Sequence, residues 1–318
     1  MAKQHIQPAE IFESARFGWP VVVQRRAAAD ATKPLEIRDA CSSQEVSALM
    51  LAGGGPDAHH PGVLVHGVVP SLPYVELTRT VMRCFGLRAV VAPEGGAHRI
   101  AVLAASYADL GTVDVEPDAS LAGVALAAAC LAGGELRVPG IEERSPQGDA
   151  RVADHLRAFG CDAGRDRDGL FAAGLPTRGA SLDLFGEPDL APVLTAVAAS
   201  AALRVGARSK LAGLETLVGK ESDRLAGIAE ALTAVGLAVD VEGREAIAIA
   251  PGESPPSGGV VLDARGDHRM AFLHALLGLV AAPGVSGVVT RDGRCVDKTW
   301  PRFWEAMESL GLEVVRGA

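Results

Sequence analysis

The chain has 318 residues, about twice the length of a typical domain, which predicts two compact units. Hydrophobic residues make up 48% of it and charged residues 22%, a composition that excludes a largely disordered protein. Its 39 acidic and 30 basic residues give a net charge of −9, which argues against a general binder of nucleic acids or anionic membranes.

The cysteines indicate reduced thiols rather than disulfides or a zinc site, because none form a Cys-x-x-Cys pair and no histidine lies at ligand spacing. They are Cys41, Cys84, Cys130, Cys161 and Cys295. The first residues lack the apolar core of a secretion signal, and apolar stretches such as 121–134 are too short to span a bilayer. We therefore expect a cytoplasmic protein.

The first polar segment in chain order opens an apolar helix predicted over 46–51. Ser42, Ser43 and Gln44 offer hydroxyl and amide groups that suit phosphate or sugar oxygens. Serine is also a common helix cap, so a purely structural role stays open for this segment.

A repeated unit is clearest at 222–251. Apolar residues from Leu225 to Val235 lie on one helical face, Gly236 ends the helix, and two strands follow around a polar turn at 242–244. The same step from an apolar residue to glycine recurs at Gly18, Gly86, Gly160, Gly236 and Gly311, at intervals of 68, 74, 76 and 75 residues. Such long units predict large α/β subdomains that bury their helices together inside sheets, rather than a solenoid.

Three segments place charged residues at predicted helix starts. In the first, Asp189 precedes a helix predicted through Leu203, where a helix cap explains it equally well. In the second, Lys220 and Arg224 would lie one helical turn apart, although like charges there cost about 0.2–0.5 kcal/mol and the helix dipole disfavours cations. A bound anion would compensate for this repulsion. The alternative is a solvated helix start whose cations are neutralised by Glu221 and Asp223.

The third segment precedes an apolar helix predicted over 271–280. Arg269 lies beside Asp267, which can hold it, and beside His268, which can titrate near neutrality. Asp267 could equally be only an N-cap. Lys298 precedes a further helix start and is by itself a weak indication of a site.

Eight motifs in chain order carry a family resemblance. They are SSQ at 42–44, PSLPY at 70–74, VEPDAS at 115–120, PQGD at 146–149, PDLAP at 188–192, GKESDRL at 219–225, GDHRMA at 266–271 and CVDKTWPRFW at 295–304. In this order the chain resembles the 5-enolpyruvylshikimate-3-phosphate (EPSP) synthase family. KESDR and DHRMA together are specific to it, and the paired serines with Lys220 favour it over UDP-N-acetylglucosamine enolpyruvyl transferase.

The resemblance implies an α/β (α+β) fold, an EPSP synthase-like inside-out barrel of repeated βαβαββ units in two domains. We expect a first domain over 1–115, with two repeat units and the first unit absent, and a second domain over 116–318 with three. The family's N-terminal segment has no match here. Gln7, Thr216 and Val218 stand where the family has an arginine, an asparagine and an arginine.

For the phosphorylated acceptor, the resemblance implies a pocket built from hydroxyl groups. Ser42, Ser43 and Ser71 would hold the phosphate of shikimate 3-phosphate. Gln44 and Tyr74 would line the same pocket.

For the chemistry, the resemblance makes Asp189 the base toward the attacking ring hydroxyl, which Lys220 would also contact. Glu221 would transfer a proton at the methylene carbon of phosphoenolpyruvate. Protonating that carbon creates a cationic centre, so the reaction needs an acid, a base and dense positive charge.

The resemblance assigns the remaining cations to phosphoenolpyruvate. Arg224 and Arg269 would bind its carboxylate and Lys298 its phosphate, while His268 would lie beside the two arginines and orient them. No metal or other cofactor is implied. A site walled by cations is expected to close only when bound anions neutralise it.

Three interpretations stay open. The first is an enolpyruvyl transferase that joins phosphoenolpyruvate to a phosphorylated cyclic hydroxy acid by addition and elimination, or a repurposed relative acting on another ring acid or carboxyvinyl compound. The second is one chain of a split enzyme, with self-association or a partner chain covering an apolar flank. The third is a non-catalytic binding homologue, against which Asp189 and Glu221 argue because a binder needs no acid and base.

Overall fold

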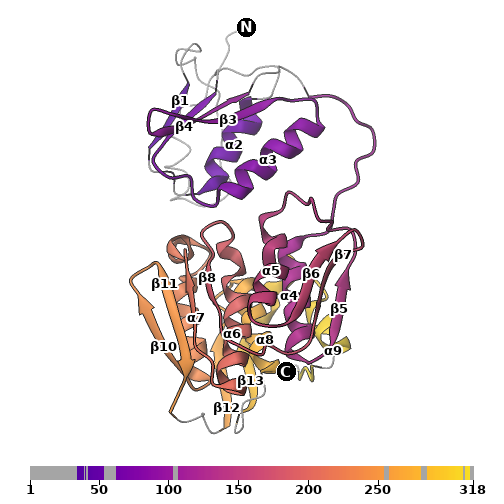
Figure 1. Ribbon diagram of the computed structural model, residues 1–318, viewed down its shortest axis with the longest axis vertical. Helices are drawn as coiled ribbons and strands as arrows, with labels where there is room; N and C mark the ends of the chain where they lie inside the picture. Colours follow the sequence, from indigo (N-terminus) through magenta and orange to yellow (C-terminus); the bar gives the residue numbers. More distant parts are fainter. Residues whose placement is uncertain are drawn as a thin grey trace. The chain divides into compact units, whose positions relative to one another are not determined.

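The computed structural model describes residues 34–38, 40, 42–53, 62–102, 107–253, 258–280, 285–310 and 312–315. They divide into two compact units, each with its own sheets and helices (Figure 1). The first contains the described residues up to Val69 together with Thr78–Gly111, and the second contains Pro70–Leu77 and the described residues from Thr112 on. The predicted domains over 1–115 and 116–318 stay a prediction. Gln7, Cys41 and the helix ends predicted at Gly18 and Gly311 lie outside the described residues.

The first unit follows the order βαβαββ. Its elements are β1 (Leu35–Arg38), α2 (Ser43–Gly53), β2 (Val63–His66), the part of α3 (Leu72–Cys84) from Thr78 on, β3 (Ala89–Glu94) and β4 (Ala97–Val102). The sheet order is β1-β2-β4-β3, in which β1 and β2 are parallel and the other neighbours antiparallel. Helix α2 packs on β2 and β4, so Val46 and Met50 are buried against Val63, Val65 and Ile100.

The second unit begins with an antiparallel sheet of order β5-β7-β6. Its elements are α4 (Ala119–Leu131), β5 (Glu135–Val138), the short 3₁₀ helix η1 (Gly148–Arg151), α5 (Val152–Ala158), β6 (Asp162–Asp166) and β7 (Gly169–Ala173). Asp118 caps α4, since its carboxylate accepts hydrogen bonds from the backbone N–H groups of Ser120 and Leu121.

The next repeat is a complete βαβαββ unit with sheet order β10-β11-β9-β8. Its elements are β8 (Ser181–Asp183), η2 (Pro188–Leu190), α6 (Ala191–Val205), β9 (Ser209–Ala212), η3 (Glu215–Gly219), α7 (Arg224–Ala234), β10 (Leu237–Glu242) and β11 (Ala246–Pro251). The helix and two strands predicted over 222–251 are therefore confirmed.

The last repeat has a parallel pair of strands in its described part. Its elements are β12 (Gly258–Asp263), α8 (His268–Leu279), β13 (Val285–Arg291), η4 (Gly293–Lys298) and α9 (Phe303–Ser309). Phe303 of α9 packs against Phe272 of α8, with ring centroids 4.7 Å apart, and so joins the end of the repeat to the core.

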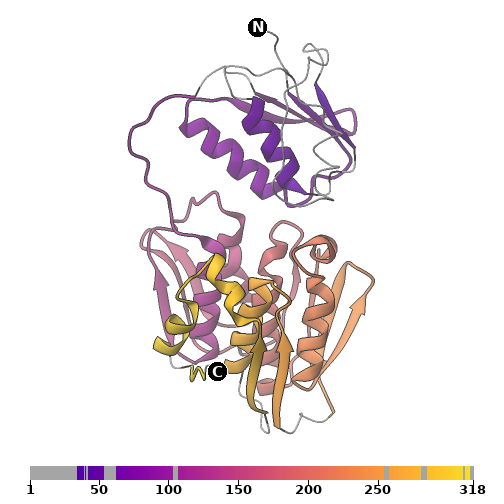
Figure 2. The same ribbon diagram turned by 180° about the vertical axis from the view of Figure 1, so that it is seen from behind.

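Helices α4, α6 and α8 pack against one another at the centre of the second unit, and the strands lie outside them (Figures 1 and 2). Every residue of α6 from Ala191 to Ala202 is buried. A helix that is apolar all round must be surrounded by protein, so the predicted inside-out arrangement is confirmed. Pro188–Val205 is long and apolar enough to cross a membrane, but 78% of it is buried, as expected for a core helix.

The glycines that end the repeated helices have a backbone reason to be glycine. Gly86, Gly160 and Gly236 have φ angles of +80°, +89° and +87°. Residues with a side chain rarely adopt this conformation, so glycine at the helix C-terminus lets the chain reverse into the following strand.

The described cysteines Cys84, Cys130, Cys161 and Cys295 are free thiols, as predicted.

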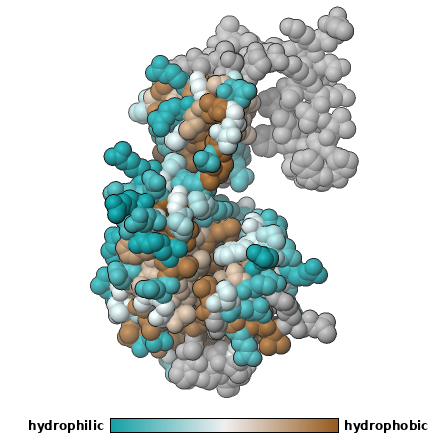
Figure 3. Space-filling model, turned by 90° about the vertical axis from the view of Figure 1, so that its right-hand side faces the viewer, coloured by the Kyte–Doolittle hydropathy of each residue, from teal (hydrophilic) through white to brown (hydrophobic). Residues whose placement is uncertain are grey.

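On the face shown in Figure 3, hydrophobic residues reach the surface among hydrophilic ones. A partner chain or self-association over an apolar flank stays a prediction.

The aromatic cluster around Phe303 generates a stability prediction. Phe303→Ala should lower the free energy of unfolding by about 3–5 kcal/mol, because the ring is fully buried against Phe272, Trp300 and Trp304. Urea unfolding measures the loss. The control Val289→Ala, 55% exposed, should cost under about 1 kcal/mol. Equal losses for the two variants would contradict a core role for this cluster.

Candidate functional site

The N-terminus of α8 fixes the first part of the site. Asp267 is fully buried and caps the helix, accepting a hydrogen bond from the backbone N–H of Arg269 at 3.0 Å. The hydroxyl of Ser222 donates to the other carboxylate oxygen at 3.0 Å. Asp267 is thus an N-cap, as one alternative predicted, but its oxygens have charged partners as well.

Arg224 joins two carboxylates from different helices. Its side chain is only 3% exposed, and its Nε and Nη2 atoms donate to Asp267 at 2.7 and 3.2 Å. Its Nη1 atom donates to Oδ1 of Asp189 at 2.8 Å. Burial raises the pKa of Asp267, but the Arg224 guanidinium outweighs it, so the net pKa of that carboxyl is lowered.

Two expectations about these pairings are wrong. Helix α7 begins at Arg224 with Asp223 as its N-cap, so Lys220 precedes the helix in an extended conformation and does not lie one turn away. Asp267 pairs with Arg224 rather than with its sequence neighbour Arg269, because capping α8 turns its carboxylate toward α7.

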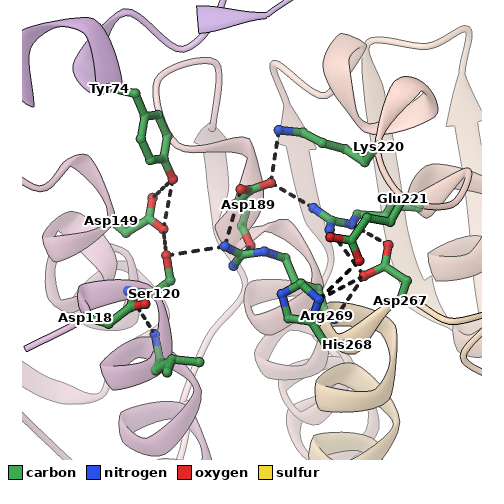
Figure 4. Close-up of polar contacts among 12 residues, drawn as sticks. Tyr74, Asp118, Ser120, Asp149, Asp189, Lys220, Glu221, Asp267, His268 and Arg269 are labelled. Atoms are coloured by element: carbon green, nitrogen blue, oxygen red, sulfur yellow. Dashed lines mark hydrogen bonds and ion pairs between the residues drawn. The ribbon is translucent and has the colours of Figure 1, made fainter. Parts of the chain in front are cut away.

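Asp189 is the point where three cations meet (Figure 4). Its carboxylate lies 3.3 Å from Lys220 Nζ, 2.8 Å from Arg224 Nη1 and 3.3 Å from Arg269 Nη2. Arg269 also donates to the Asp189 backbone carbonyl at 3.1 Å. Burial raises the pKa of Asp189, but Arg269, Lys220 and Arg224 together lower it below the ordinary value.

Asp189 does not cap α6. The N-cap of that helix is Leu190, and no side chain forms a cap hydrogen bond there. The cap interpretation of Asp189 is therefore wrong, and its partners are the three cations.

Glu221 and Lys298 form the second charged group. Lys298 Nζ lies 2.6 Å from Glu221 Oε2, and the same oxygen lies 3.2 Å from Nδ1 of His268. Burial lowers the pKa of His268, and Arg269 and Lys298 lower it further against the opposite effect of Glu221. The expected pairing of Glu221 with Lys220 or Arg224 is not found, because Glu221 reaches the end of η4 instead.

In a third group, Ser120 and Asp149 were not assigned from the sequence, whereas Tyr74 was predicted to line the acceptor pocket. Ser120 at the start of α4 donates a hydrogen bond to the buried carboxylate of Asp149, and Tyr74 donates to both of its oxygens at 3.2 Å. Arg269 Nη2 lies 3.4 Å from the Ser120 hydroxyl (Figure 4). Ser120 and Asp149 belong to the motifs at 115–120 and 146–149, but nothing in the local sequence there distinguishes a site residue from a helix cap.

Asp149 and Asp189 flank Arg269 with opposite protonation tendencies. Burial raises the pKa of Asp149, outweighing the hydroxyl groups and the arginine that lower it. Burial also raises the pKa of the Tyr74 phenol, and Asp149 raises it further. Asp189 is the carboxylate whose charge the cations favour, whereas Asp149 is the more easily protonated of the two.

The structure places the other predicted residues as follows. Ser42, Ser43 and Gln44 lie at the start of α2 in the first unit, where the Ser42 hydroxyl accepts from the Gln44 backbone N–H at 3.2 Å, as a helix cap does. Ser71 belongs to the second unit, is buried, and has a φ angle of +50°. A positive φ is uncommon at a residue other than glycine, and Arg265 and Asp292 share it here, at +53° and +55°.

Glu221, Asp267 and His268 could in principle share a cation, since one ligand atom from each lies within 4.8 Å of the others. Their carboxylates already pair with Lys298 and Arg224. The protein's own cations therefore supply the positive charge at these positions.

The buried pair of Arg224 and Asp267 generates a pH prediction. Asp267→Asn keeps the N-cap acceptor but removes the charge, and should lower the free energy of unfolding by about 3 kcal/mol at pH 7. Because the pKa of Asp267 is lower in the folded state, its stabilisation is full above the unfolded pKa of about 3.9 and is lost as pH falls through the folded value. The difference between the two proteins should therefore be constant from pH 7 down to about pH 4 and shrink at lower pH.

Urea unfolding at several pH values measures this difference. The control is Glu230→Gln, which removes an exposed pair with Arg265 and should cost at most about 1 kcal/mol. A difference for Asp267→Asn that stays constant from neutral to acid pH would contradict the ionised pair.

The chain is similar in sequence and in fold to known proteins. The family model for EPSP synthase (3-phosphoshikimate 1-carboxyvinyltransferase) matches residues 8–307. Relatives named 3-phosphoshikimate 1-carboxyvinyltransferase from Methanoculleus marisnigri and Laribacter hongkongensis are 35% and 37% identical, over 85% of this chain and 61% and 60% of their own. The chain thus spans about three fifths of the length of these relatives.

A solved structure of EPSP synthase from Acinetobacter baumannii has the same fold. Its TM-score is 0.61 at 22% identity, over 89% of this chain and 64% of that one. Together with the match over 8–307, these similarities show that the chain belongs to the EPSP synthase family.

Proposed function

We propose that the protein transfers the enolpyruvyl group of phosphoenolpyruvate to a hydroxyl of shikimate 3-phosphate and releases phosphate. The observation that carries the proposal is the meeting of Lys220, Arg224 and Arg269 on the single carboxylate of Asp189. Buried cations held close together by one acid form a site for anions that also contains a base.

The cations suit phosphoenolpyruvate. Arg269 is partly exposed and can donate to a carboxylate. Arg224 is 3% exposed and its Nε, Nη1 and Nη2 atoms already donate to Asp267 and Asp189, so it adds positive charge behind Arg269. Lys298 is half-exposed beside Glu221 and is accessible to a phosphate group. We assign the carboxylate to Arg269, with Arg224 behind it, and the phosphate to Lys298, while His268 orients Glu221 through its Nδ1 contact.

The two carboxylates suit the proton transfers. Glu221 delivers a proton to the methylene carbon, and the acceptor hydroxyl attacks the neighbouring carbon as Asp189 takes its proton, with Lys220 beside the same oxygen. The intermediate then loses phosphate and one methyl proton, which restores the double bond and leaves the enolpyruvyl ether. Positioned acids and bases of this kind contribute about 10²–10⁴-fold each.

We assign the acceptor's phosphate to Ser42 and Ser43 of the first unit and to Ser71 of the second, and further contacts with the acceptor to Gln44 and Tyr74. The substrates are small anions, and we place the reaction in the cytoplasm.

A different ring acid as acceptor is the second candidate. The hydroxyl of Thr216, where the resemblance leads one to expect an asparagine that contacts the sugar, is buried and has no hydrogen-bond partner among the described residues. An acceptor with a different arrangement of hydroxyl groups would account for this substitution.

The first test is turnover by the purified chain. Phosphoenolpyruvate and shikimate 3-phosphate together should release phosphate and yield a carboxyvinyl ether that mass spectrometry identifies. Each substrate alone should release none. Release with another ring acid but not with shikimate 3-phosphate would support the second candidate, and no release with any acceptor would contradict both.

The second test separates chemistry from binding. Glu221→Gln should lower kcat by about 10²-fold or more and leave KM for phosphoenolpyruvate within about threefold, because the amide cannot transfer the proton. Lys298→Gln should instead raise that KM by about tenfold or more, since it removes a phosphate contact. Steady-state kinetics of both variants check the assignment. It fails if the two variants change the same constant.

A further inference from the structure

Glu187 is a buried carboxylate that no part of the proposed reaction uses. Its side chain is 0% exposed, and it directly precedes Pro188 and Asp189. Its Oε1 atom lies 2.8 Å from Nε2 of His155 and 3.0 Å from Nη1 of Arg151. Burying a carboxylate is unfavourable unless it is paired, and an apolar side chain would fill the same space at lower cost. A role beyond stability is therefore needed to explain it.

The backbone of Glu187 begins the turn that carries Asp189. Its N–H donates to the carbonyl of Leu184 at 3.1 Å, and its own carbonyl accepts from the N–H of Leu190 at 3.0 Å. Pro188 fixes one backbone angle of this turn. Because the turn η2 has only three residues, the anchored side chain of Glu187 sets its position more than the turn itself does.

The partners of Glu187 come from the segment that carries the other acid beside Arg269. Arg151 ends η1, which contains Asp149, and His155 lies on α5 directly after it. Asp149 and Asp189 lie on either side of Arg269 (Figure 4). The buried carboxylate of Glu187 therefore connects the segment that carries Asp149 to the segment that carries Asp189, and Arg269 lies between these two acids.

We propose that Glu187, held by His155 and Arg151, is a positioning residue that keeps the Asp189 carboxylate in contact with Lys220, Arg224 and Arg269. The kinetic consequence of this inference rests on the proposed function. Its geometric consequence, the setting of the Asp189 carboxylate, is independent of turnover.

The kinetic test uses Glu187→Asp, which keeps the charge but shortens the side chain by one methylene group. Its kcat should fall by about tenfold or more, with KM values for both substrates within about threefold, because misplacing a proposed base slows chemistry more than binding. Arg151→Gln, at a half-exposed partner, should fold normally and lower kcat by about threefold. Ile249→Ala, in the core of β11 and away from this link, is the stability control.

Thermal unfolding of all three variants separates positioning from stability. If Glu187→Asp and Arg151→Gln lose no more kcat than Ile249→Ala at a similar loss of stability, the inference is overturned.

A second readout needs no turnover. Carboxyl NMR of the Asp189 side chain should show its pKa rising in Glu187→Asp toward the ordinary value of about 3.9, because the three cations that lower it are no longer in place. Arg151→Gln should give a smaller rise, and Ile249→Ala none. An unchanged pKa in Glu187→Asp would overturn the inference even if the enzyme is active, while a raised pKa without any turnover would uphold it and refute the proposed function.

Discussion

The site depends on the ion pairs that the buried guanidinium group of Arg224 forms with Asp267 and Asp189. It joins the starts of α6, α7 and α8, so moving any one of these helices would separate a charge from its partner. Buried ion pairs are seldom the most stabilising solution, because removing both charges from water offsets most of their attraction. Their retention here is better explained by the need to hold charged groups in fixed positions before a substrate arrives.

The repeated unit explains how residues far apart in the sequence meet. Each repeat of the second unit buries a helix beside the central helices of its neighbours, and the N-terminal ends of α4, α6 and α8 come together. Ser120, Asp189 and Arg269 stand near those three ends, which is why side chains from three repeats share hydrogen bonds (Figure 4). Converging helix N-termini also favour anions through their exposed backbone N–H groups.

Much of the repeated fold and several residues of the candidate site could be predicted from the sequence, for reasons that differ between residues. Arg224 and Arg269 were identifiable because cations at helix starts are unfavourable without a compensating anion, and the helix of 222–251 followed from its periodicity. Lys220 was placed at the same helix start, but it precedes the helix. The partners could not be predicted: Asp267 caps α8 and still reaches Arg224, and Glu187 pairs with His155 across 32 residues. Such pairings depend on how the repeats pack against one another. In the sequence, an acidic residue before a helix has the pattern of an N-cap whichever cation it pairs with in the structure.

The ionisation of Asp189 connects the resting site to its proposed reaction. With its three cations in contact, Asp189 is a weak base, because they stabilise its charged form. In the proposed reaction, an anionic substrate beside Arg224 and Arg269 would share their positive charge, so its arrival would raise the proton affinity of Asp189 when the acceptor hydroxyl loses a proton. Asp149 differs from Asp189 and Asp267 because burial outweighs its partners and its net pKa is raised, and its hydrogen-bond partner Ser120 lies next to Arg269. The cations assigned to the substrate can thus also set the strength of the base, provided that Asp189 contacts all three of them.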